Sequence, residues 1–375
     1  MYRIILLIAF SLILSGSLFS EEITKTIDVN EGGTLNVELK TGGSIHVEGW
    51  DQKQVQVEVS FRHSSLEPGD VNIDKSGNVV NIRIDDLSNG NHSGNVPVLT
   101  INVPKKFNIE VETMGGEIEI TDVEGKFSGQ TMGGSLKLKM LKGNIHMTTM
   151  GGRIYLSDSD IDGELKTMGG DVYFENVYGD IKGSTMGGEV TMKNVQDSKG
   201  KTAGEVKIST MGGDINVDDA PQGADVHTMG GDITIKRAKR FVKAKTMGGE
   251  IDIREVDGSV KASTMGGEVT VVMVGDGSVS GKDIDLSSMG GEITLTLPKN
   301  ISAKFELHLT YTKDSKQDYE IISDFDLKVE EKTKDWEYKK GSPRKEIEGK
   351  GQVGDGKNSI YIKTINGNIR IKKGA

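Results

Sequence analysis

The stretch Thr113-Met114-Gly115-Gly116, followed by Glu117-Ile118-Glu119-Ile120, decides the fold of this 375-residue chain. Thr-Met-Gly-Gly recurs with an 18-residue period and ends in a Ser-Met-Gly-Gly variant. Two longer intervals interrupt the period, and we assign their extra residues to inserts at 197–204 and 275–282. The units begin at Thr113, Thr131, Thr149, Thr167, Thr185, Thr210, Thr228, Thr246, Thr264 and Ser288. A period of this length is too short for repeats of paired helices and is typical of one coil of a β-solenoid.

Apolar residues alternate with polar ones on both sides of each unit. Ile145 and Met147 precede Thr149 by four and two positions, and another apolar residue, such as Val123 or Val274, stands ten positions after the threonine. Alternation of this kind predicts strands with one buried face. Since the same positions recur in each coil, we expect them to stack into one continuous aliphatic core.

The threonines share the parity of the apolar residues before them, so we expect them to point into the core. A buried hydroxyl needs a partner, and a threonine column can bond to neighbouring coils and to the turn backbone. Glycine tolerates positive φ and lets stacked corners approach closely. We therefore assign structural roles to the threonines and to glycines such as Gly115, Gly116, Gly133 and Gly134.

The methionines of the unit form a second column, which allows several interpretations. If they point outward, they form a soft apolar stripe suited to a partner surface. If the bend falls between threonine and methionine, they fill a corner of the core, and we favour this because a thin rod needs bulk. Copper(I) binding by thioethers is a third option. Candidates for a partner surface are Met114, Met132, Met150, Met168, Met186, Trp336 and Tyr338.

The N-terminus is typical of an export signal. Arg3 precedes an apolar run from Ile4 to Leu14, and small residues follow. We predict a signal peptide at 1–20, because the run is too short to span a bilayer. No second hydrophobic segment follows. We therefore expect no transmembrane domain after cleavage, and export to the periplasm, the cell surface or the medium.

The rest of the chain divides into three predicted parts. These are an N-terminal β cap at 21–110, β-solenoid repeats at 111–297, and a C-terminal region at 298–375. The cap contains a degenerate coil at Thr41–Val47 that lacks methionine. The C-terminal region holds a strand, a charged excursion at 313–357, and a last coil around Thr364.

Composition and motifs exclude several classes of function. A formal net charge of −10 argues against nucleic acid as a partner. The absence of cysteine excludes disulfides, cysteine-bound zinc and thiol catalysis. The six histidines do not recur in register, so we predict no catalytic, cofactor or metal site. An acidic residue follows most Gly-Gly pairs, and we favour a solvated strand edge over calcium binding for this column.

Val103-Pro104, the strand Asn108–Glu112 and the following Gly-Gly-x-Ile-x-Ile ladder resemble the bacterial "putative adhesin" domain family of unknown function. The chain is similar also to the auto-transporter adhesin-head (GIN) domain, over residues 25–373. The resemblance implies a right-handed parallel β-helix at the cell envelope and brings no catalytic residues.

We therefore predict an all-β solenoid of about ten 18-residue coils with β caps at both ends. Its expected function is that of a non-catalytic structural or adhesin-like envelope protein, with an envelope polysaccharide or protein as its partner. Two alternatives stay open: a carbohydrate-active β-helix enzyme, which would need clustered acidic and basic residues in a groove, and an envelope-stress accessory protein.

Overall fold

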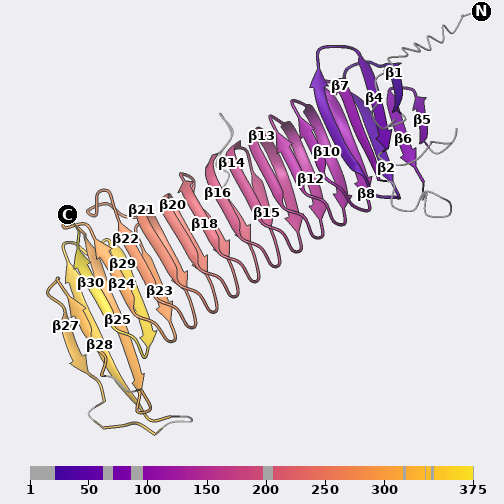
Figure 1. The fold of residues 1–375 in the computed structure, drawn as a ribbon. Coiled ribbons are helices and arrows are strands. Elements are labelled where there is room, and N and C mark those ends of the chain that lie inside the picture. The colour runs from indigo at the N-terminus through magenta and orange to yellow at the C-terminus, as the bar shows by residue number, and fades with distance from the viewer. Residues whose placement is uncertain are drawn as a thin grey trace, which may run out of the picture.

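The computed structural model describes residues 22–61, 71–85, 96–196, 206–315, 318–333, 335–338 and 342–374. In these ranges the regular elements are β-strands, which wind into a rod of stacked coils between an N-terminal and a C-terminal cap (Figure 1). The all-β, solenoid-like class predicted from the repeat is thus confirmed. None of the described residues forms a helix long and apolar enough to cross a membrane.

One side of the rod is a parallel sheet whose central strands lead into the repeat threonines, here called the threonine sheet. Neighbouring strands are in step by one repeat, so that Thr131 pairs with both Thr113 and Thr149. In order along the rod, its parallel strands are β6 (Val79–Ile84), β2 (Gly33–Leu39), β8 (Phe107–Thr113), β10 (Glu124–Thr131), β12 (Lys142–Thr149), the second half of β13 (Ile154–Thr167), β15 (Ile181–Ser184), β17 (Val206–Ser209), β19 (Ala224–His227), the second halves of β20 (Ile233–Lys245) and β21 (Ile251–Ser263), β23 (Ile284–Ser288), β29 (Asn358–Ile365) and β25 (Ala303–Thr312).

The other side is a second parallel sheet, here called the opposite sheet, which the chain enters after each Gly-Gly pair. Its strands keep the same one-repeat step, as in the pairing of Leu136 with Ile118 and Ile154. In order, they are β7 (Pro97–Pro104), β3 (Ser44–Trp50), β9 (Ile118–Thr121), β11 (Leu136–Lys139), the first half of β13, β14 (Val172–Tyr178), β16 (Val190–Gln196), β18 (Ile215–Ala220), the first halves of β20 and β21, β22 (Val269–Met273), β24 (Ile293–Leu297), β30 (Ile369–Lys373) and β26 (Ile321–Ser323).

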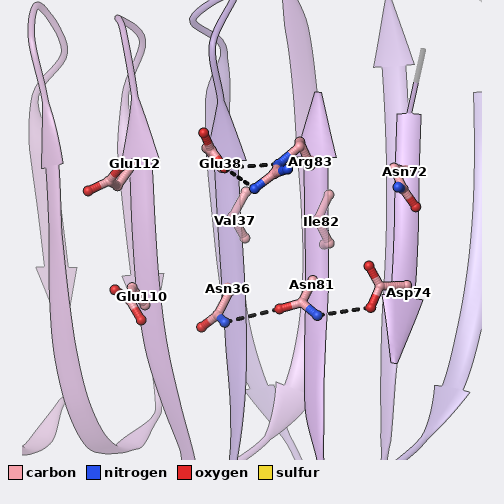
Figure 2. A pocket seen from close by; sticks show the side chains of 10 residues that line it. All are labelled: Asn36, Val37, Glu38, Asn72, Asp74, Asn81, Ile82, Arg83, Glu110 and Glu112. Atoms are coloured by element: carbon pink, nitrogen blue, oxygen red, sulfur yellow. Dashed lines mark hydrogen bonds and ion pairs between the residues drawn. The ribbon is translucent and has the colours of Figure 1, made fainter. Parts of the chain in front are cut away.

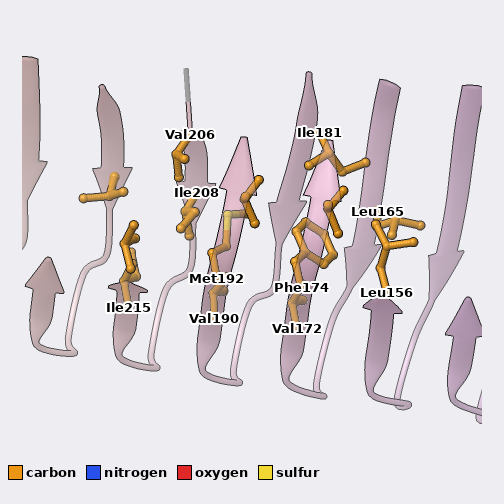
Figure 3. Close-up of a cluster of buried hydrophobic side chains, with 14 of the residues drawn as sticks. Leu156, Leu165, Val172, Phe174, Ile181, Val190, Met192, Val206, Ile208 and Ile215 are labelled. Carbon is orange, nitrogen blue, oxygen red and sulfur yellow. The ribbon is translucent and has the colours of Figure 1, made fainter. Parts of the chain in front are cut away.

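The core is a thin aliphatic layer between the two sheets (Figure 3). Leu156 and Phe174 point inward from the opposite sheet, and Leu165 points inward from the threonine sheet, all fully buried. One expected core residue is displaced: Val274 is only partly buried, whereas Met273 is buried and pairs with Val256. The cause is a register shift in the pairing of β21 with β22, between Ile253 and Val256. The inward position of β22 therefore falls one residue earlier, on Met273.

Antiparallel strands close both ends of the rod. At the N-terminal end, β5 (Val71–Ser76) pairs with β6, β4 (Gln54–Phe61) pairs with β7, and β1 (Glu22–Asp28) pairs with β4. At the C-terminal end, β28 (Arg344–Val353) pairs with β25, and β27 (Lys328–Glu331) pairs with β28. A reversal of strand direction ends the parallel stacking at a sheet edge, where unpaired strands invite aggregation.

The degenerate coils predicted at both ends are present. Strand β2 ends before Thr41, and β3 begins at Ser44; both pair in parallel with strands of the first full coil. Strands β29 and β30 pair in parallel with β23 and β24 of the Ser288 coil. The segment 313–357, which we predicted to be a charged excursion, contains the strands β26, β27 and β28. The predicted signal peptide at 1–20 and the insert at 197–204 lie outside the described residues.

Candidate functional site

The repeat threonines fix the methionine corner, which is the turn formed by each Thr-Met-Gly-Gly unit. All ten hydroxyl residues are at most 5% exposed, as their parity predicts. The Oγ1 of Thr149 donates to the Gly134 carbonyl of the preceding coil at 2.7 Å and accepts the Gly152 N–H of its own coil at 3.1 Å. Ser288 makes the same two contacts, each at 2.9 Å. The hydroxyl column therefore joins successive turns.

The two glycines of each unit differ in what they allow. A Cβ added to the second glycine, Gly134, would lie 1.5 Å from the Gly116 carbonyl oxygen. A Cβ added to the first glycine, Gly133, would meet nothing within 4 Å. Among the glycines of the ten Thr/Ser-Met-Gly-Gly units, all of them described, only Gly116 has a left-handed φ, of 95°. Close approach of stacked coils, rather than positive φ, therefore requires the second glycine.

The methionines point outward, so our favoured interpretation that they pack in the core is wrong. Met114 is 56% exposed and Met211 is 43% exposed, and most others lie between these values. The corner has no room for them, because the threonine hydroxyl and the backbone of the second glycine fill its inside. We call this column the methionine edge; it comprises Met114, Met132, Met150, Met168, Met186, Met211, Met229, Met247, Met265 and Met289.

A shallow groove of about 320 Å³ runs beside the first four residues of the methionine edge. Its polar walls include Lys40, Gln130 and Thr148. The edge is therefore a continuous apolar ridge with an adjoining depression, as the outward interpretation of the methionines predicts.

The acidic column is a strand edge with local hydrogen bonds. The Asp214 carboxylate accepts the backbone N–H of Asp232, and the Asp232 carboxylate accepts that of Glu250, both at 2.8 Å. Glu292 pairs with Arg370 at 2.8 Å. These contacts agree with the structural interpretation that we favoured.

Among the residues that the structure describes, two clusters bring metal-type ligand atoms together. They are His46 with Glu117 and Glu119, and Glu306 with His308 and Glu348. In each cluster a lysine ammonium already pairs with a carboxylate. Lys137 pairs with Glu117 at 2.9 Å, and Lys332 and Lys350 both pair with Glu348. Hydrogen bonds from these two lysines lower the pKa of Glu348 to about 2. We assign neither cluster as a metal site.

A polar cleft lies on the outer face of the threonine sheet in the N-terminal cap, with a volume of about 430 Å³ (Figure 2). Strands β8, β2, β6 and β5 supply its outward side chains in two ranks. In one rank, Asn36 donates to Asn81 at 3.0 Å, and Asn81 donates to Asp74 at 2.9 Å. In the other, Arg83 pairs with Glu38 at 2.8 Å. The ion pair and the amide chain fix the walls of the cleft.

One atom of this cleft lacks a partner. The Oδ1 atom of Asn36 is buried and receives no hydrogen bond from any residue that the structure describes. The residue directly opposite Asn36 on β8 is Glu110, whose carboxylate can only accept. A buried acceptor without a donor is costly. The cleft is therefore suited to a ligand that carries hydrogen-bond donors.

A second surface lies on the opposite sheet, where Tyr155 and Tyr173 stack with ring centroids 5.2 Å apart. The Lys193 ammonium stands 5.0 Å from the Tyr173 ring centroid. Burial raises the pKa of Tyr155. A groove of about 320 Å³ surrounds the pair and includes Arg153 and Asp171.

The two aromatic candidates of the C-terminal region have different environments. The Trp336 ring packs edge-on against Tyr311 at 5.7 Å, and Lys345 lies 5.3 Å from its centroid. Tyr338 is 75% exposed. Trp336 thus contributes to the cap, whereas Tyr338 is available to a partner.

Sequence reasoning missed the polar cleft and the tyrosine pair. The cleft joins residues from Asn36 to Glu112 through four strands, so no linear motif marks it. The tyrosine pair carries a detectable signal, because Tyr155 and Tyr173 occupy the same outward position in consecutive coils.

The fold is that of an extended β-solenoid with capped ends, and comparisons with known proteins agree with this class. Residues 18–372 match the family model described as Toastrack DUF4097, so the chain belongs to this family. No curated protein matches it.

Several solved structures are similar at low identity. Three of them are a putative adhesin from Parabacteroides distasonis ATCC 8503 (14% identity, 73% of this chain and 96% of that one, TM-score 0.39), a putative cell adhesion protein from Clostridium sporogenes ATCC 15579 (12%, 95% and 100%, TM-score 0.21), and a putative lipid binding protein from Parabacteroides distasonis ATCC 8503 (12%, 94% and 97%, TM-score 0.22). Likenesses this distant carry no argument about function.

Proposed function

We propose that this protein is a non-catalytic, adhesin-like binding protein of the cell envelope whose partner is a polysaccharide. In this proposal residues 1–20 are a cleaved export signal, 21–110 and 298–375 are caps, and 111–297 is a right-handed rod of about ten coils.

The observation that supports this proposal is the unpaired acceptor in the polar cleft. Sugar hydroxyl groups donate and accept hydrogen bonds, so one hydroxyl can satisfy the buried Asn36 Oδ1 once a side-chain movement in the cleft exposes this atom, while a neighbouring hydroxyl accepts from Arg83. Four carboxylates and one guanidinium line the cleft, which gives it an excess of negative charge. Neutral or amino-sugar polymers therefore fit it better than acidic ones.

The catalytic alternative receives less support. General acid catalysis on a glycan needs a carboxyl with a raised pKa beside a second carboxylate in a groove. Burial, together with Glu22, raises the pKa of Glu58, but these two lie on the paired strands β4 and β1, outside the polar cleft. The cleft is better suited to binding than to bond cleavage.

A substitution at Glu110 tests the proposal. Glu110→Gln places an amide donor opposite Asn36 Oδ1, so the protein would satisfy its own acceptor. We expect binding to dextran or chitin oligosaccharides, measured by calorimetry, to weaken roughly tenfold without loss of thermal stability.

The matched control is His146→Ala, at the same outward position two coils along the threonine sheet. It should leave affinity unchanged, and hyaluronate should bind more weakly than the neutral glycans. Equal affinity of wild type and Glu110→Gln, or release of reducing ends from any probe, would contradict the proposal.

A further inference from the structure

The Thr-Met-Gly-Gly unit has four positions, and the fold explains only two of them. The threonine hydroxyl joins successive turns, and the second glycine permits their close approach. The first glycine has room for a Cβ at every unit, with no contact closer than 3.4 Å. The methionine is half exposed. The two positions without a structural role lie side by side on the outer edge of the rod.

Methionine is retained in all ten units, although the first core column after the glycines varies among aliphatic residues. The first inward position after the glycines is Ile118, Leu136, Ile154, Val172 and Val190 in successive coils. The threonine position itself accepts Ser288. In the last coil Ile365 replaces methionine, so an aliphatic side chain fits this turn. Apolar bulk therefore does not explain the column, and the thioether is what the ten units share.

The methionine edge is continuous along the rod. Across the first long interval the Gly212 N–H donates to the Met186 carbonyl at 3.0 Å, so Met186 and Met211 remain neighbours. In the sequence, both inserts begin after the apolar position ten residues beyond the threonine. They therefore start at the corner of the coil that lies away from the methionines. Nothing in the repeat sequence interrupts the sulfur column from Met114 to Met289.

The spacing of the coils suits an ion held between two sulfurs. Neighbouring coils lie about 4.8 Å apart. Zinc–thiolate bonds measure roughly 2.3 Å, and with bonds of similar length one ion in linear coordination would span roughly 4.6 Å between two sulfurs. Methionine has three rotatable bonds, which absorb the small difference.

We propose that the methionine edge binds soft monovalent cations of the Cu(I) and Ag(I) class, each held by thioethers of two or three consecutive coils. Thioethers select such ions over Ca²⁺ and Mg²⁺, which prefer oxygen ligands. Glu38 and Glu112 line both the polar cleft and the groove beside Met114, but the methionine side chains lie outside the cleft, so either proposal can fail without the other.

Two variants with the same number of substitutions test the pairing of sulfurs. The alternate variant carries Met→Leu at positions 132, 168, 211, 247 and 289, which leaves five methionines two coils apart. The block variant carries Met→Leu at positions 211, 229, 247, 265 and 289, which leaves five consecutive methionines. Both variants keep an apolar surface, and we expect both to fold, which thermal melting measures.

Purified protein is titrated with silver nitrate, with calorimetry and the methionine methyl resonances as readouts. Wild type should bind several equivalents, and the edge methyl groups should shift whereas those of buried Met147 and Met192 should not. The block variant should keep half of the capacity at unchanged affinity.

The alternate variant should bind at least roughly 100-fold more weakly, because loss of an outer-shell partner alone already costs roughly 10–100-fold in metal affinity. Equal binding by the two variants would overturn the shared-ion geometry. Absence of silver binding by wild type, or shifts confined to methionines outside the edge, would overturn the proposal itself and leave an apolar surface.

Discussion

The chain changes direction at two corners of each coil, and the two corners use different residues for the turn. The methionine corner repeats one four-residue solution in ten units and accepts no insert. The far corner, formed by the residues nine to twelve positions after each threonine, varies from coil to coil and is where both inserts begin. Several of its residues have left-handed φ values between 51° and 56°: Asp122, Met140, Asp158, Asn176 and Asn194.

This difference separates what stacking requires from what it tolerates. At the methionine corner, backbone atoms of successive coils approach so closely that a single side-chain atom is excluded. At the far corner the chain instead mostly uses residues that tolerate left-handed φ, and side-chain amide hydrogen bonds join three of them, Asp158, Asn176 and Asn194. Steric exclusion therefore forces strict repetition of the sequence at the methionine corner. At the far corner only a loose preference for certain residue types remains.

The largest effect is expected from the second glycine of the methionine corner. In Gly231→Ala the new Cβ would lie 2.1 Å from the Gly213 carbonyl oxygen. Both atoms belong to backbone, so no rotamer change relieves the contact. We expect a loss of roughly 3 kcal/mol or more in the free energy of unfolding, measured by urea denaturation followed by circular dichroism.

The first glycine of the same unit is the control. In Gly230→Ala the nearest atom to the Cβ is 3.6 Å away, which is an ordinary contact. This variant should be neutral or more stable by up to about 1 kcal/mol, because alanine restricts the unfolded chain. Equal losses at the two glycines would show that close approach does not govern this corner.

The inside of the rod was predictable because parity alone determines it. The inward threonines and the aliphatic columns followed from alternation, as Thr149 and Leu165 illustrate. Parity also places methionine outward, since it follows an inward threonine. We instead favoured packing of the methionines in the core, because a thin core needs bulky side chains. The structure shows that glycine backbone already fills the corner.

The polar cleft was not predictable, because strand order in the cap does not follow chain order. Strand β2 lies between β6 and β8, which come later in the sequence. Asn36 thereby meets Asn81 on one side and Glu110 on the other, over separations that no local pattern encodes. The displacement of Val274 by Met273 has a similar origin, because a register shift between paired strands caused it.

An intermediate effect is expected from the threonine column. In Thr246→Val the Gly231 carbonyl loses a hydroxyl donor at 2.9 Å, and the Gly249 N–H loses an acceptor at 3.2 Å. Two buried backbone groups without partners should cost about 2 kcal/mol in the free energy of unfolding.

Thr246→Ser keeps the hydroxyl, as Ser288 does in the native chain, and should cost less than about 1 kcal/mol, in line with the loss of one methyl group. The measurement is again urea denaturation. If valine costs no more than serine, the hydroxyl column does not stabilise the stacking.

The smallest effect is expected at the far corner, where Met140 is the exception in the left-handed column. It adopts φ 52° and is 44% exposed, whereas Asn176 at the same position two coils later adopts φ 53°. Asn176 donates to Asp158 at 3.0 Å and accepts from Asn194 at 2.8 Å. Met140→Asn would place an amide between Asp122 and Asp158, so it should raise stability by about 1 kcal/mol, because asparagine tolerates this φ better.

The reverse exchange, Asn176→Met, loses both amide contacts and gains backbone strain, so it should lower stability by about 1–2 kcal/mol. The two sites are two coils apart but share Asp158 as a neighbour, so the double variant should depart from the sum of the single effects by about 0.5 kcal/mol or more. Thermal melting of the three variants measures this. If Met140→Asn destabilises the rod, backbone conformation does not select the residues of the far corner. The sequence variability of this corner would then arise from its outer surface and not from the turn.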